Sequence, residues 1–87
     1  MNTNIDKKTN RYKKAVIDKI TNILEDLSEF DNMIPKEIEN DYQAVVVSNK
    51  ILLQATNDLI SMNKSTKKEM LDSLKESELF IKLLRKL

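Results

Sequence analysis

The sequence predicts an all-α protein, either a small antiparallel three-helix bundle or a helical hairpin with a third helix laid on it. Apolar residues recur at spacings of three and four along three long segments, which is the period of an amphipathic helix. The chain has no glycine and one proline, and two short polar breaks separate the segments. Such short connections place sequential helices antiparallel. We expect helices over about residues 10–30, 35–62 and 66–86, in a single helical domain of residues 10–87 that follows a flexible basic segment of residues 1–9.

The first predicted helix has an apolar stripe whose members alternate in spacing between four and three residues. The stripe consists of Val16, Ile20, Ile23, Leu27 and Phe30. Thr9 or Asn10 is expected to cap the start of this helix. Asn32 is expected to adopt the left-handed conformation after its end, because asparagine takes that role where glycine is absent.

The second predicted helix begins at Pro35, which suits a first helical turn because its missing N–H costs nothing there. Its main stripe contains Ile38, Tyr42, Val45, Leu52 and Leu59, with Val46, Leu53 and Ile60 beside it. Two further stripe positions are polar, namely Asn49 and Thr56. We expect Tyr42 to lie in the core with its hydroxyl at the rim.

The third predicted helix starts with a capping box, in which Thr66 and Glu69 bond to each other's backbone amides. Its inward positions are Met70, Leu74, Ile81 and Leu84, with Ser77 filling one slot.

The composition excludes most catalytic and metal-binding classes. The 87 residues include no His, Cys, Gly or Trp, so zinc fingers, thiol nucleophiles, Ser-His-Asp triads and P-loops are excluded. Three pairs of acids lie four residues apart and are expected on solvated faces; these are Glu25 with Glu29, Glu37 with Asp41, and Asp72 with Glu76. We therefore predict a protein that is not an enzyme and that has no catalytic residue, cofactor or metal site.

Charge is distributed unevenly although the chain as a whole carries only +1. In an up-down-up bundle the N-terminus and the second connection share one end, where lysines and arginine gather. We call this set the basic pole; it consists of Lys7, Lys8, Arg11, Lys13, Lys14, Lys64, Lys67 and Lys68. These residues are candidates for binding an anion such as a nucleic-acid backbone. A solvated charged surface explains them more simply, and nucleic acid is weakly supported because Tyr12 is the one aromatic residue among them.

Two stretches place apolar residues outside the expected core stripes. Val47 and Ile51 lie off the main stripe of the second helix, and Leu79 and Leu83 lie on a face of the third helix that begins with charged residues. One explanation is that a central second helix contacts both neighbours and that the third helix wraps further around the bundle. The other is that these four residues bind a protein partner, either a second copy in a homodimer or another helix.

Several features favour a cytoplasmic location. The chain can form no disulfide, and no apolar signal segment follows the first residues. Its longest uninterrupted apolar run, residues 44–47, is far shorter than the roughly 18 residues that a membrane span needs.

In size, bundle shape and mixed surface charge, the chain is similar to small helical proteins of bacterial or phage mobile elements. These include regulators, inhibitors, antitoxins and bacteriocin immunity proteins. The similarity is one of architecture, and it carries no functional residues over to this chain. The leading hypothesis is a non-catalytic protein that docks on another protein. The alternatives are a structural subunit of a larger coiled-coil or helical complex, and a nucleic-acid accessory protein that uses the basic pole.

Overall fold

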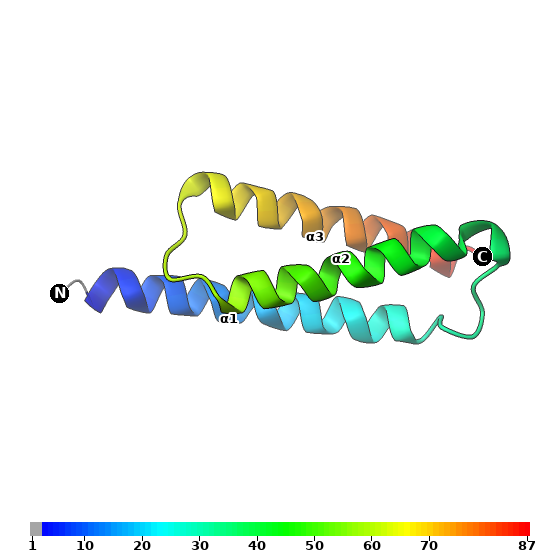
Figure 1. Ribbon diagram of the computed structural model, residues 1–87, viewed down its shortest axis with the longest axis horizontal. Coiled ribbons are helices and arrows are strands. Elements are labelled where there is room, and N and C mark those ends of the chain that lie inside the picture. Colours follow the sequence, from blue (N-terminus) through cyan, green and yellow to red (C-terminus); the bar gives the residue numbers. More distant parts are fainter. Residues whose placement is uncertain (1–2) are drawn as a thin grey trace.

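The computed structural model describes the backbone of residues 3–87 and the side chains of residues 10–87. It contains three long helices, α1 (Thr3–Ser28), α2 (Glu39–Asn57) and α3 (Lys64–Arg85), and a short 3-10 helix, η1 (Lys36–Ile38), before α2. The three long helices run alternately in opposite directions and form an elongated bundle (Figure 1). The prediction of an all-α three-helix bundle is therefore confirmed.

Helix α1 begins earlier than the sequence pattern indicated. It starts at Thr3, so the expected start at residue 10 with a cap at Thr9 or Asn10 is wrong. The apolar stripe begins only at Val16, and the sequence contains no Pro or Gly before it that would stop the helix from continuing toward the N-terminus. The expected flexible segment 1–9 lies partly outside the described backbone and wholly outside the described side chains.

The connection between α1 and α2 is built without a left-handed residue. No described residue has a positive φ, so the expectation for Asn32 is wrong. Instead, amides of the connection bond to carbonyls three residues earlier, among them Phe30 to Leu27 at 3.0 Å and Met33 to Phe30 at 2.8 Å. These tight turns provide hydrogen-bond partners for carbonyls at the end of α1, and their residues keep right-handed backbone conformations. Pro35 lies just before η1 with a φ of −61° and is not part of a first α-helical turn.

Helix α2 ends at Asn57, five residues before the expected end at residue 62. The ammonium group of Lys13 on α1 donates hydrogen bonds to the carbonyls of Asn57 (2.9 Å) and Leu59 (2.7 Å). The first bond satisfies the last carbonyl of α2, which has no partner within the helix, and the second holds the chain just after the helix. Because the chain leaves the helix here, Ile60 is 88% exposed and does not lie beside the core stripe.

Helix α3 is capped by Asn63 and not by the predicted Thr66 capping box. The side-chain oxygen of Asn63 accepts a hydrogen bond from the Thr66 amide at 2.8 Å, and the helix begins at Lys64. Asparagine is among the strongest N-cap residues and stands three positions earlier than the threonine, so it ends the connection first.

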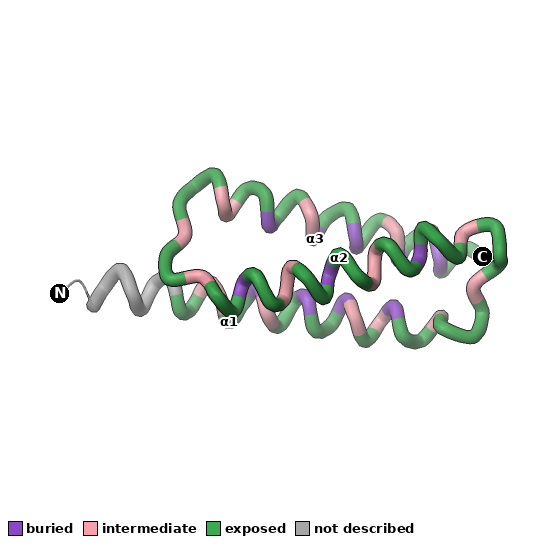
Figure 2. Tube along the Cα trace, in the orientation of Figure 1, coloured by how far each residue is buried: buried purple, intermediate pink, exposed green. Residues whose placement is uncertain are grey.

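Nine apolar side chains among residues 10–87 are buried, and those on α1 and α3 follow the predicted stripes. Figure 2 shows how the buried positions are distributed along the three helices. The nine are Val16, Ile20, Ile23, Leu27, Tyr42, Met70, Leu74, Ile81 and Leu84. Helix α2 contributes only Tyr42 to this set, while its Val45, Val46, Leu52 and Leu53 are partly buried. The other two buried side chains of α2 are polar, namely Asn49 and Thr56.

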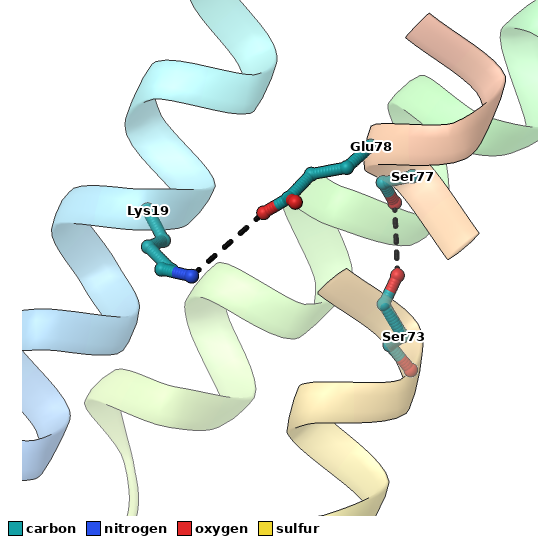
Figure 3. Close-up of polar contacts among 4 residues, drawn as sticks. All are labelled: Lys19, Ser73, Ser77 and Glu78. Atoms are coloured by element: carbon teal, nitrogen blue, oxygen red, sulfur yellow. Dashed lines mark hydrogen bonds and ion pairs between the residues drawn. The ribbon is translucent and has the colours of Figure 1, made fainter. Parts of the chain in front are cut away.

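Polar side chains of α2 and α3 also lie in the interior. Asn49 donates from its amide to the Ser77 hydroxyl at 2.9 Å, and Ser77 donates to the Ser73 carbonyl (Figure 3). Thr56 is buried and donates to the Leu52 carbonyl within its own helix at 2.7 Å. The bond between Asn49 and Ser77 fixes the axial register of α2 relative to α3.

The hydroxyl of Tyr42 is buried and not at the rim, which corrects the expectation from the sequence. It donates to the Leu27 carbonyl on α1 at 2.5 Å. Burial raises the pKa of Tyr42 above its usual value, and the negative charge of Asp31 adds to this rise. The tyrosine thus joins α1 to α2 as a neutral hydrogen-bond donor.

Candidate protein-binding face

The four apolar residues that the sequence singled out are all exposed. The exposed fraction is 50% for Val47, 64% for Ile51, 60% for Leu79 and 61% for Leu83. The interpretation in which neighbouring helices cover these side chains is therefore wrong. The core is formed without them, by residues at other positions of the three helices.

An apolar groove of about 680 Å³ lies between the start of α2 and the end of α3. Its apolar lining comes from both helices and from η1, namely Ile38, Ala44, Val45, Phe80, Leu83, Leu84 and Leu87. Leu83 belongs to both the groove and the set of four exposed residues. Val47, Ile51 and Leu79 line neither this groove nor the two smaller ones beside it. We use the name α2–α3 face for the groove together with the four exposed apolar residues of these two helices.

Two smaller grooves continue along the line where α2 meets α3. One of about 360 Å³ is lined by Ala44, Ser48, Ser73 and Glu76 among others. The next, of about 280 Å³, includes Leu52, Ala55, Thr66 and Glu69. Small side chains on both helices leave the contact between α2 and α3 shallow on its outer side, so the α2–α3 face extends along much of the bundle.

The basic pole is only partly available for an external anion. Lys13 is committed to the α2 carbonyls, and the Lys67 ammonium lies 5.0 Å from the centroid of the Tyr12 ring, within the range of a cation–π interaction. This contact also shows that α1 and the start of α3 meet at one end, as predicted. The remaining described members are exposed, namely Arg11, Lys14, Lys64 and Lys68. Lys7 and Lys8 lie outside the described side chains.

The three pairs of acids lie on exposed positions of the helices and their connections. Within residues 10–87, no three acidic side chains gather closely enough to hold a metal ion. None of the described helices is long and apolar enough to cross a membrane.

Ion pairs occur where α3 packs beside α1. Lys19 lies 3.8 Å from Glu78 (Figure 3), and Arg85 lies 3.7 Å from Asp26. These four side chains are roughly half exposed, so each pair contributes less than about 1 kcal/mol to stability. Their main effect is to balance charge on the α1–α3 side of the molecule.

Sequence reasoning found Leu83 but missed the groove that it lines. Ile38 was assigned to the core stripe of the second helix and Phe80 was given no role, and both are partly buried. Leu87 is 76% exposed and was not singled out. The available signal was the position of Phe80, three residues before Leu83 and therefore next to it on the helix surface.

Comparison of the chain with protein-family models, with curated proteins and with solved structures finds no match. The features that bear on function are therefore those of the molecule itself. The α2–α3 face is the largest apolar feature among them, and the partly occupied basic pole is the second.

Proposed function

We propose that this chain is a non-catalytic helical protein that acts by binding another protein, and that its α2–α3 face receives a helix of that partner. The observation that carries the proposal is the apolar groove between α2 and α3, which the exposed Leu83 lines; Val47, Ile51 and Leu79 are further exposed apolar residues of the same two helices. An exposed apolar patch next to a groove is typical of a protein interaction site.

The shape of the face favours a helix as the bound element. The groove follows two neighbouring antiparallel helices, and a third helix can pack its side chains between theirs. The small residues Ala44, Ser48 and Ala55 on α2 would allow the axis of a bound helix to approach closely.

The available apolar surface is sufficient to drive binding. Complete burial of a Val, Ile or Leu side chain contributes about 1.5–3 kcal/mol, and each of the four is already half covered or less. Covering the remainder would contribute about 1–2 kcal/mol for each residue before the entropic cost of association is subtracted. Leu83 is the expected centre of the interface because it also lines the groove.

Such a protein would serve as a regulator, inhibitor, antitoxin or immunity-type protein of a bacterial or phage mobile element. A structural subunit of a larger helical complex would use the same face but would depend on its partners to fold. The nine-residue core within one chain favours a protein that folds by itself. The basic pole gives less support to a nucleic-acid accessory role because Lys13 and Lys67 already have contacts within the chain.

The proposal is tested by affinity capture with three forms of the protein. Wild type, Leu83→Asp and the double variant Lys64→Glu/Lys68→Glu are used as baits in a lysate of the native host. The captured protein is identified and purified, and its affinity for each form is measured by calorimetry. We expect Leu83→Asp to weaken binding by about 30-fold or more, as loss of a central interface residue does, and the lysine variant to bind as wild type does.

Circular dichroism verifies that each variant is folded. Binding that survives Leu83→Asp and Ile51→Asp but is lost on Lys64→Glu/Lys68→Glu would overturn the proposal in favour of the basic pole.

A further inference from the structure

We infer that the partner helix is basic: an amphipathic helix whose apolar stripe is flanked by lysine and arginine residues. The inference rests on the proposed function and names the chemistry of the partner that the α2–α3 face selects. It is carried by the charges that line the grooves of this face.

The grooves along α2 and α3 are bordered by acids. Asp41 lines the largest groove, Glu76 the middle one and Glu69 the third. The one basic residue among the three linings is Lys86, at the end of the largest groove. All four side chains are exposed, so they are available to a bound helix.

This acidic border does not reflect the charge of the whole protein, which is +1. It also differs from the α1–α3 side, where the acids Asp26 and Glu78 have the basic partners Arg85 and Lys19. Among residues 10–87, the acids Asp41, Glu69 and Glu76 take part in no ion pair. The three grooves thus combine apolar linings with three acids that take part in no ion pair within the described part of the chain.

A basic amphipathic helix complements both parts of this face. Its apolar stripe would cover Leu79, Leu83 and the groove, and its flanking cations would lie beside the acidic edges. Long lysine and arginine side chains suit this position, because their aliphatic stems cover apolar surface while their charges remain in water. Opposite charges across the interface would also raise the association rate and favour this partner over acidic helices.

A second copy of the chain fits the face less well. In a two-fold contact centred on the middle groove, Glu76 of one copy would lie beside Glu76 of the other, and like charges across an interface oppose association. The charge pattern therefore selects a different chain over self-association.

The inference is tested with two synthetic helical peptides of about 18 residues, a length of about 27 Å that approaches the length of α2. Both have the same apolar stripe, but one is flanked by Lys and Arg and the other by Glu. Binding of each labelled peptide to the full chain is measured by fluorescence anisotropy. We expect the basic peptide to bind at least tenfold more tightly at low salt, and this preference to shrink as salt rises to about 0.5 M.

Variants locate the effect on the molecule. Glu69→Lys/Glu76→Lys should remove or reverse the preference for the basic peptide. The matched control Glu25→Lys/Glu29→Lys makes the same change of net charge at the end of α1 and in the turn that follows it, and should leave the preference unchanged. Leu83→Asp should abolish the binding of both peptides.

The outcomes separate this inference from the proposed function. Equal affinity for the two peptides, with both lost in Leu83→Asp, would overturn the basic partner but leave helix binding intact. Loss of the preference in the control Glu25→Lys/Glu29→Lys would overturn the inference and remove support for the face itself. Failure of both peptides to bind at concentrations up to about 1 mM would do the same. A dimer detected by light scattering and lost in Leu83→Asp would identify a second copy as the occupant and would also overturn the inference.

Discussion

Replacement of Lys13 by methionine tests the contact that ends α2. The ammonium group of Lys13 lies on α1, 44 residues before Asn57 in the chain, and donates hydrogen bonds to the Asn57 and Leu59 carbonyls. Methionine keeps most of the aliphatic stem of the side chain but has neither the charge nor the donors. The change therefore removes the polar contact with little loss of packing.

The expected effect follows from the surroundings of the two bonds. A hydrogen bond to a charged group contributes about 1.5–3 kcal/mol when well enclosed, and a cation near a helix C-terminus about 0.3–1 kcal/mol. The bond to Asn57 is exposed to solvent and the bond to Leu59 is partly buried, so both contribute less than the enclosed value. We expect Lys13→Met to lower the free energy of unfolding by about 1–2 kcal/mol.

The assay is urea denaturation followed by circular dichroism at the helical minimum, together with thermal unfolding. For a domain of this size, 1 kcal/mol shifts Tm by about 4–8 °C, so a decrease of about 4–16 °C is expected. The matched control is Lys14→Met, which changes the neighbouring exposed lysine and should alter stability by less than about 0.5 kcal/mol. Equal stability of the two variants would refute the assignment of Lys13 as the residue that completes the end of α2.

Three further predictions concern Tyr42, the start of α3 and the proposed face. Tyr42→Phe removes the hydroxyl bond to Leu27 and should cost about 0.5–1.5 kcal/mol, since the Leu27 carbonyl still accepts from the Phe30 amide. Because the pKa of Tyr42 is raised in the folded state, the hydroxyl contributes its full stabilisation below about pH 10, and this stabilisation is lost as the pH rises further. The free energy of unfolding should therefore fall more steeply above pH 10 for wild type than for Tyr42→Phe in an alkaline denaturation series. Asn63→Ala should lower the free energy of unfolding by about 0.5–2 kcal/mol in chemical denaturation, whereas Glu69→Ala should have little effect. A larger loss for Glu69→Ala than for Asn63→Ala would show that the Thr66–Glu69 capping box starts the helix instead. Leu83→Asp should leave the unfolding midpoint nearly unchanged because the side chain is 61% exposed, and a loss above about 2 kcal/mol would show that the residue belongs to the core.

Most of the internal core could be predicted from the sequence. The stripe of Val16, Ile20, Ile23 and Leu27 is buried as predicted, and Ser77 occupies a core slot of α3. This succeeded because the spacing of apolar residues reflects the geometry of a single helix, which needs no knowledge of the other helices. The same periodicity identified the four exposed apolar residues, since they fall outside the stripes.

The ends of the helices were decided by contacts that periodicity does not contain. Lys13 satisfies the end of α2 from another helix, and Asn63 competes successfully with Thr66 for the start of α3. The position of the Tyr42 hydroxyl likewise depends on how closely α1 approaches α2.

By itself, the sequence determined that this protein is helical, which side of each helix faces inward, and that some apolar surface is left over. Only the tertiary structure decided that Phe80 and Leu83 meet Ala44 and Val45 in a groove, and that acids without an ion pair among residues 10–87 line this groove and the one beside it. The reason is physical: a helix fixes the relative directions of its own side chains, whereas the distance and level of a neighbouring helix depend on packing summed over the whole bundle.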